Sequence, residues 1–170
     1  MLRVNNLKKH YGDFSLDVTM EVKEGRITGL VGRNGAGKST AFKCILDLVN
    51  ADGGSIELFG KNPKDFSVSD KEKLGVVLAD STFCGYLKIK DIISIMNAMY
   101  TDFDKEYFTD LCKRFNLPMN KRIKDFSTGM KAKLKVAAAV SHNAKFLVLD
   151  EVTSGLDVVV REEILDILRD

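Results

Sequence analysis

The chain has 170 residues, of which 45% are hydrophobic and 29% are charged, and this composition suits one globular domain with its own core. Its 26 Lys and Arg residues nearly balance 24 Asp and Glu residues, which leaves a net charge of +2 and gives no support to bulk binding of nucleic acid or membrane surfaces. No apolar run approaches the roughly 20 residues that cross a bilayer, and the N-terminus lacks a signal-peptide pattern. If the protein works at a membrane, other chains must supply the membrane part.

The three cysteines, Cys44, Cys84 and Cys112, are far apart and form no Cys-x-x-Cys pair. We interpret them as reduced thiols of a cytosolic protein rather than as a disulfide framework or a zinc site. Cys44 falls inside a predicted helix and is expected to be a small core residue.

The N-terminal third predicts a strand pair followed by a strand, a loop and a helix. Residues 14–23 alternate between apolar and polar, which is typical of a half-buried antiparallel strand, and residues 2–7 are its expected partner. Residues 27–31 predict a strand buried on both faces. Residues 38–49 carry apolar side chains at helical spacing and predict a helix that ends before Asn50.

The remaining elements complete an α/β pattern. Further strands are expected at 55–59, 74–78 and 146–149, and helices at 89–99, 103–115, 130–140 and 158–168. The pattern predicts an α/β fold with a mostly parallel sheet, an N-terminal antiparallel β portion and an inserted helical subdomain. We expect residues 1–80 and 141–170 to form the core and residues 81–140 the helical subdomain.

A glycine-rich motif lies between the strand predicted at 27–31 and the helix predicted at 38–49. Residues 32–39 read Gly-Arg-Asn-Gly-Ala-Gly-Lys-Ser and fit the phosphate-binding pattern G-x-x-x-x-G-K-[ST]. Backbone N–H groups of such a loop and the positive end of the following helix hold phosphates. Lys38 is expected to reach the β- and γ-phosphates, and the Ser39 hydroxyl to ligate Mg²⁺. The motif therefore predicts a P-loop NTPase core that binds ATP with Mg²⁺, with these residues around the nucleotide: Gly32, Asn34, Gly35, Ala36, Gly37, Lys38, Ser39 and Thr40.

An apolar strand predicted at 146–149 ends in two carboxylates, Asp150 and Glu151. Ligands of open α/β sheets lie at the carboxyl ends of strands. This places Asp150 as a second Mg²⁺ ligand and Glu151 as the residue that orients or deprotonates the attacking water. Many strands end in acids, so the interpretation depends on the phosphate loop.

The order of motifs resembles the nucleotide-binding domains of ABC ATPases. After the phosphate loop and the helical insert come residues 126–131, Phe-Ser-Thr-Gly-Met-Lys, then the acidic strand end, then residues 154–157, Ser-Gly-Leu-Asp. The resemblance covers essentially the whole chain. It implies a catalytic role for Glu151 and Lys38.

The resemblance also assigns residues outside the phosphate loop. It implies that Tyr11 stacks on adenine, although a Tyr at a strand end is also common. It implies that Ser127 and Gly129 contact ATP held by a second nucleotide-binding subunit, whereas an ordinary helix N-cap would explain the Ser equally. Asp157 resembles the turn that lines the dimer interface.

Partners and location follow from the same resemblance. It implies a homo- or heterodimer with a second nucleotide-binding subunit, a transmembrane permease as partner, and a peripheral place at the cytoplasmic face of the cell membrane. The expected function is ATP hydrolysis that drives export of an unidentified substrate, with no nucleic-acid partner. The alternative is a soluble ABC-type ATPase that acts on nucleic acid or ribosomes, although coiled coils, a second cassette and a charged linker are all missing from the sequence.

The chain departs from the family pattern at several positions. Phe126 and Thr128 stand where Leu and Gly are usual in the signature, and Val152 replaces a frequent Pro. The expected Gln after the strand at 74–78 is replaced by Ala79 or Asp80, and Asp80 is either a metal or water ligand or a solvated loop acid.

Neither histidine matches the switch residue of the family. His10 precedes the phosphate loop, and His142 is expected at the surface or as a helix cap. Because the chain stops at Asp170, we expect a truncated fragment that hydrolyses ATP poorly.

Residues 80–87 are the candidate segment for contact with a permease. Phe83 and Tyr86 are expected to be exposed there and to receive a cytoplasmic helix of the membrane partner. Packing of the same aromatic side chains into the helical insert is the alternative.

Overall fold

The computed structural model describes residues 1–169. The chain forms two compact units, Met1–Val68 and Ser69–Asp170. The second unit contains the predicted helical insert together with the strand pair on either side of it, so the division at residues 80 and 140 stays a prediction.

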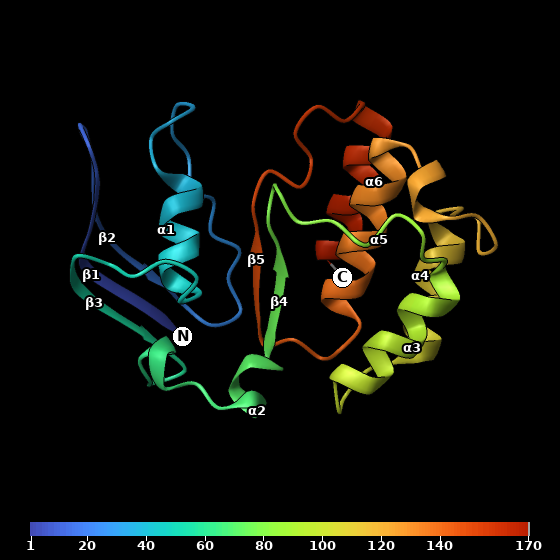
Figure 1. The fold of residues 1–170 in the computed structure, drawn as a ribbon, viewed down its shortest axis with the longest axis horizontal. Coiled ribbons are helices and arrows are strands. Elements are labelled where there is room, and N and C mark those ends of the chain that lie inside the picture. Colours follow the sequence, from blue (N-terminus) through green and yellow to red (C-terminus); the bar gives the residue numbers. More distant parts are fainter. Residues whose placement is uncertain (170) are drawn as a thin grey trace. The chain divides into compact units, whose positions relative to one another are not determined.

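A three-stranded antiparallel sheet forms most of the N-terminal unit (Figure 1). Its strands are β1 (Leu2–Tyr11), β2 (Phe14–Val22) and β3 (Gly53–Leu58), in the order β2-β1-β3. The predicted pairing of the first two strands is confirmed, and the register runs from Leu2 opposite Val22 to Tyr11 opposite Phe14. A register shift between Val4 and Leu7 adds a bulge to β1. Because side chains alternate along a strand, this bulge keeps both Leu2 and Leu7 in the core.

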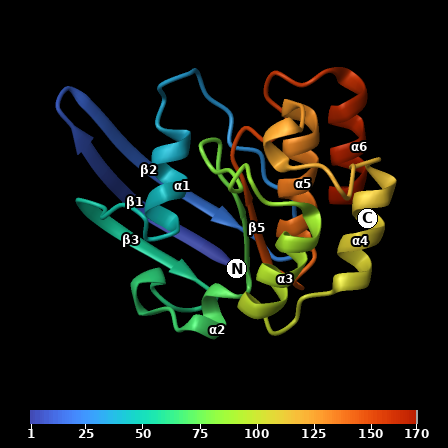
Figure 2. The ribbon, with the colours of Figure 1, turned by 45° about the vertical axis from the view of Figure 1, so that its right-hand side comes forward.

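Helix α1 (Lys38–Ile45) covers one face of this sheet (Figures 1 and 2). Its buried residues Ala41, Cys44 and Ile45 belong to the same core as Leu2, Val4, Leu7, Leu16 and Leu58. The helix ends four residues earlier than the sequence predicts. Asp47 has a φ of +54°, and the N–H groups of Leu48 and Val49 both donate to the carbonyl of Lys43, so the chain turns there instead of continuing the helix.

The strand predicted at residues 27–31 is wrong. This segment is irregular, and the side chains of Ile27 and Val31 are 82% and 95% exposed. A strand buried on both faces takes its stability from the strands on either side. Among residues 1–169, no strand pairs with this segment, so its apolar run alone does not make it a strand.

The C-terminal unit is built on two parallel strands, β4 (Leu74–Val77) and β5 (Phe146–Leu149). Leu74 lies opposite Phe146 and Val77 opposite Leu149. Helix α5 (Thr128–Val140) packs against β4. Gly75 permits this close approach, because a Cβ there would collide with the Ala139 carbonyl of α5 and with the Leu147 side chain.

Helices make up the rest of this unit, and the predicted helical insert is confirmed. The helices are α2 (Val68–Lys71), α3 (Ile89–Met99), α4 (Lys105–Arg114), α5 (Thr128–Val140) and α6 (Val158–Arg169), with a 3-10 turn at Ile123–Asp125; a further 3-10 turn, Pro63–Asp65, belongs to the N-terminal unit. One hydrophobic cluster, centred on Phe108, Leu111 and Leu134, joins α3, α4 and α5, and a second, containing Val136 and Ile164, joins α5 and α6. The fold is thus mixed α/β, as predicted, and β4–β5 is the one parallel strand pair among residues 1–169. No helix within residues 1–169 is both long enough and apolar enough to span a bilayer.

Candidate nucleotide-binding site

The glycine-rich loop adopts the conformation that its sequence requires. Gly35 and Gly37 have φ values of +80° and +91°, which lie in the left-handed region that glycine enters without steric cost. A Cβ on Gly37 would also lie 2.7 Å from Phe14 Cζ and 2.9 Å from Leu16 Cδ1. Any other residue at this position would therefore strain the backbone and collide with the side chains of Phe14 and Leu16.

The N-terminus of α1 has the features of an anion-binding site. Gly37 is its N-cap, and no side chain in residues 1–169 caps it. The Ala41 N–H donates to the Gly37 carbonyl over 2.8 Å, and the N–H groups of the three residues before Ala41 precede the first intrahelical hydrogen bond. The first turn holds no acidic residue, so its N–H groups and the helix dipole favour a negative ligand.

Lys38 folds back over the loop. Its Nζ donates to the carbonyls of Gly32 over 3.0 Å and Arg33 over 3.2 Å. Residues 32–36 are exposed, so a phosphate can reach the loop, and the Lys38 ammonium can exchange its carbonyl partners for phosphate oxygens. Ser39 and Thr40 lie in the first turn of α1. The loop therefore has the conformation and exposure that a nucleoside triphosphate requires, and the binding of Mg²⁺ by the Ser39 hydroxyl stays a prediction.

Tyr11 is the last residue of β1, and its side chain is 50% exposed. One face of its ring carries a cation, because Lys9 Nζ lies 5.2 Å from the ring centroid. The role of Tyr11 in adenine stacking stays a prediction.

The acidic residues gather at one edge of the parallel strand pair. Asp150 directly follows β5, is buried, and donates its N–H to the Val77 carbonyl over 2.8 Å. Asp80 follows β4 and is exposed. Because parallel strands have their carboxyl ends at the same edge, Asp80 lies at the same edge as Asp150 and Glu151.

Glu151 is held in an unusual backbone conformation. Its φ is +51°, its side chain is exposed, and its carbonyl accepts the Ser154 N–H over 2.9 Å. A left-handed φ costs a non-glycine residue about 1–2 kcal/mol. Strained residues of this kind occur at functional sites, but Asn6, Asp47, Phe59, Asn116 and Asn143 also have a positive φ, so the catalytic role of Glu151 stays a prediction.

Lys135 of α5 is a neighbour of Asp80 that the sequence did not reveal. Its Nζ donates to the Ser81 carbonyl over 3.1 Å. Burial lowers the pKa of Lys135, and the charge of Asp80 partly offsets this shift. Asp80 therefore faces a cation, and its role as a metal ligand stays a prediction.

The two loops that resemble the signature and dimer-interface turns each cap a helix. Ser127 Oγ accepts the Met130 N–H over 3.2 Å at the start of α5. Asp157 Oδ1 accepts the Val160 N–H over 2.9 Å in the first turn of α6. Gly129 lies in the first turn of α5, where its missing side chain allows Val160 to approach. The ordinary capping role considered for Ser127 is thus present, and its contact with nucleotide stays a prediction.

The two aromatic residues that were predicted to be exposed, Tyr86 and Phe83, differ in how far they are exposed in the structure. Tyr86 is 73% exposed, with Lys124 Nζ 5.5 Å from its ring centroid. Phe83 is partly buried and packs against the helical core, so its predicted exposure is wrong and the alternative, packing into the helical insert, is confirmed for this residue. The apolar contacts of the adjoining helices outweigh the polar character of the loop sequence.

Phe83 also lines a cavity of about 180 Å³, together with Met96, Tyr100, Lys135 and His142. His142 is buried, so the predicted surface position is wrong. The alternative of a capping role is confirmed, because Nδ1 lies 3.1 Å from the Ala138 carbonyl near the end of α5. Nε2 lies 3.1 Å from the Leu74 carbonyl, and the imidazole stacks on Tyr100 with centroids 4.1 Å apart.

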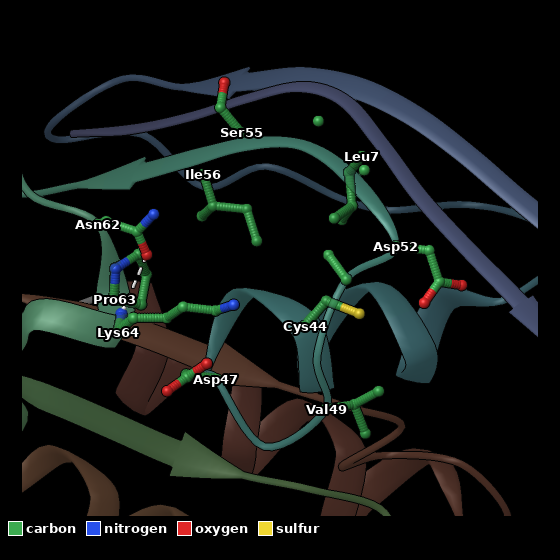
Figure 3. A pocket seen from close by; sticks show the side chains of 13 residues that line it. Leu7, Cys44, Asp47, Val49, Asp52, Ser55, Ile56, Asn62, Pro63 and Lys64 are labelled. Atoms are coloured by element: carbon green, nitrogen blue, oxygen red, sulfur yellow. Dashed lines mark hydrogen bonds between the residues drawn. The ribbon is translucent and has the colours of Figure 1, made fainter.

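Another cavity, of about 150 Å³, is lined by residues of β1, α1, β3 and the 3-10 turn that follows β3 (Figure 3). Its wall includes Leu7, Cys44 and Asp47, and Asp52 lies at the opposite end from Asn62 and Lys64. It contains no residue of the phosphate loop.

The predicted site residues fall into two groups. Tyr11 and residues 32–40 belong to the N-terminal unit, whereas Asp80, Ser127, Gly129, Asp150 and Glu151 belong to the C-terminal unit. A Mg²⁺ ion shared by Ser39 and Asp150 therefore stays a prediction.

An α/β fold with a phosphate loop at the start of a helix is the architecture of P-loop nucleotide-binding proteins. The sequence matches the ABC transporter family (ABC_tran) over residues 16–154, and the chain belongs to this family.

The relatives agree with this assignment. The chain is 33% identical to the lantibiotic transport ATP-binding protein SrtF of Streptococcus pyogenes over 171 residues, which cover 99% of this chain and 73% of that protein. It is 33% identical to the bacitracin transport ATP-binding protein BcrA of Enterococcus faecalis over 172 residues, 99% of this chain and 56% of that protein. A solved structure described as the ATP-binding subunit of an ABC transporter has a TM-score of 0.85 at 26% identity and covers 98% of this chain and 72% of that chain. The chain spans only a little over half the length of some of these curated relatives.

Proposed function

We propose that this chain binds Mg-ATP and hydrolyses it as the nucleotide-binding subunit of an ABC transporter. The observation that carries the proposal is the phosphate loop, in which Gly37 combines a left-handed φ with close packing against β2 at the uncapped start of α1. Membership of the ABC transporter family supports the same assignment.

The roles proposed for individual residues follow from their chemistry. The N–H groups of residues 34–40 and the Lys38 ammonium bind the phosphates, and Tyr11 stacks on the base. Ser39 and Asp150 ligate Mg²⁺, which neutralises phosphate charge when bound. Glu151 accepts a proton from the attacking water. Asp80 is a further candidate ligand for metal or water.

Calorimetric titration with Mg-ATP tests the binding part of this proposal. The unmodified chain should bind ATP, and Lys38→Ala should weaken binding because a charge-assisted contact to phosphate is lost. Lys43→Ala removes a lysine from the last turn of the same helix and is the matched control. Equal affinity of both variants and the unmodified chain would contradict the assignment of the loop.

We further propose that ATP binds between two such subunits and that a transmembrane permease couples their closure to export. Ser127 and Gly129 would cover the nucleotide of the opposite subunit, and the whole assembly would lie at the cytoplasmic face of the membrane. The names of SrtF and BcrA, which refer to lantibiotic and bacitracin transport, favour a peptide antibiotic as the cargo class.

Affinity purification of the tagged protein from its native cell tests the transport part. Recovery of an integral membrane protein in a fixed ratio would support the permease partnership. Recovery with ribosomes or nucleic acid instead would favour the alternative of a soluble ABC-type ATPase and would leave the ATP chemistry unchanged.

A further inference from the structure

Lys9 is buried further than the other charged residues of its strand. The bulge between Val4 and Leu7 shifts the alternation of β1, so Leu7, Lys9 and Tyr11 follow one another on the face that α1 covers. Lys8 points to the other face and lies 3.9 Å from Asp17 of β2. Two adjacent lysines therefore have different environments.

Asp52, just before β3, fixes the position of the Lys9 side chain. Its Oδ1 accepts a hydrogen bond from Lys9 Nζ over 2.9 Å, and its Oδ2 accepts the His10 N–H over 2.7 Å. The Asp52 N–H in turn donates to the Lys8 carbonyl over 2.8 Å. One carboxylate thus binds both the lysine and the backbone next to it.

The Lys9 ammonium lies over the ring of Tyr11, 5.2 Å from its centroid. A cation at this distance is attracted to the negative face of the ring, so it favours one orientation of an aromatic side chain that is otherwise half exposed. The hydrogen bond with Asp52 also raises the pKa of Lys9, and the hydrogen bonds with Lys9 and His10 lower the pKa of Asp52. Both groups therefore stay charged around neutral pH.

We propose that Lys9 and Asp52 are positioning residues for the adenine-binding face of Tyr11. Lys9 occupies one face of the ring and leaves the other for the base, while Asp52 holds Lys9 in place. The proposal rests on the proposed function, because it requires that Tyr11 stacks on a nucleotide base.

The test separates the contribution of the base from that of the phosphates. Mg-ATP and Mg-tripolyphosphate are titrated into the chain by calorimetry, and the ratio of the two affinities reports the nucleoside. Lys9→Met keeps the aliphatic stem and removes the charge, so the ratio should fall roughly two- to fivefold. Lys9→Arg retains a cation over the ring and should preserve the ratio. Asp52→Asn still accepts the His10 N–H and should lower the ratio less than Lys9→Met.

Two control experiments test whether the effect of Lys9→Met depends on the Tyr11 ring. Lys8→Met makes the same change of charge one residue away, on the other face of the strand, and should change neither affinity. In a Tyr11→Leu background, Lys9→Met should cause no further fall in the ratio, because there is no ring left to position.

Three outcomes would overturn the proposal. Equal weakening of ATP and tripolyphosphate by Lys9→Met would mean that Lys9 acts on the phosphates or on the fold. An unchanged affinity for ATP in Lys9→Met would mean that Lys9 does not position the ring, and an unchanged ratio in Tyr11→Leu would mean that the ring does not stack on a base. Failure of the unmodified chain to bind Mg-ATP would instead contradict the proposed function itself.

Discussion

Gly129 of α5 faces Val160 of α6 so closely that a Cβ on Gly129 would lie 3.3 Å from Val160 Cγ1. Ser127 caps the first of these helices and Asp157 the second. The contact therefore joins the two loops that resemble the signature and the dimer-interface turn. A glycine at position 129 has a packing reason that is independent of any ligand.

Gly129→Ala should destabilise the chain through this contact. Overpacking costs about 1–3 kcal/mol, whereas Ala in place of Gly gains about 0.5–1 kcal/mol within a helix. The two terms leave a net fall of between about 0 and 2.5 kcal/mol in the free energy of unfolding, measured by chemical denaturation. In a Val160→Ala background the clash is gone, and the same substitution should stabilise the chain. Destabilisation of equal size in both backgrounds would show that Val160 is not the cause.

Removal of Lys133 of α5 and removal of Glu163 of α6, which form an ion pair, should lower the free energy of unfolding by different amounts. The Lys133 side chain is only 11% exposed, whereas that of Glu163 is 36% exposed. Glu163→Ala leaves a buried ammonium without its carboxylate and is expected to cost about 2 kcal/mol. Lys133→Met leaves a carboxylate that can turn towards water, so it should cost less than about 1 kcal/mol.

Thermal or chemical unfolding of the two single variants and the double variant measures this coupling. Glu162→Ala, one residue away on α6 and in a more exposed pair with Arg169, is the control and should change stability little. A larger loss for Lys133→Met than for Glu163→Ala would refute the explanation from burial.

The sequence predicted the elements whose pattern is local. Residues 14–22 alternate clearly, and α3 begins and ends at the predicted residues, because apolar periodicity marks the buried face of an isolated element. The acidic edge was also predictable, since Asp150 follows an apolar strand and parallel strands share an edge.

Non-local features escaped prediction. Residues 27–31 have the composition of a buried strand, but strand formation depends on partners that a five-residue run does not specify. The bulge in β1 placed Lys9 beside Tyr11, and only the pairing of strands reveals that shift. The Lys135 contact with Ser81 joins residues 54 positions apart, and nothing in either local sequence indicates it.

Substitutions at Glu151 should separate activity from stability. Glu151→Gln keeps the shape of the side chain but not its basicity, so ATP turnover should fall by about 10²–10⁴ while nucleotide binding persists. Glu151→Gly should lose turnover similarly but unfold no more easily than the unmodified chain, since glycine accepts a φ of +51° without steric strain. Phosphate release and denaturation assays measure the two effects, and Glu162→Gln is the control. Full turnover in Glu151→Gln would remove this residue from the proposed mechanism.

Burial of Cys112 should make the stability of the chain fall at alkaline pH. Burial raises the pKa of this thiol to about 12, against about 8.5 in an unfolded chain. Between these values the unfolded state loses a proton that the folded state keeps, so the free energy of unfolding falls by about 1.4 kcal/mol per pH unit for this group. Denaturation under reducing conditions at pH 8, 9 and 10 measures the slope. Cys112→Ala should reduce the slope, whereas Cys84→Ala should not, because Cys84 is exposed. An identical slope in Cys112→Ala and the unmodified chain would assign the alkaline sensitivity to other groups, of which Cys44 is the first candidate because burial also raises the pKa of its thiol.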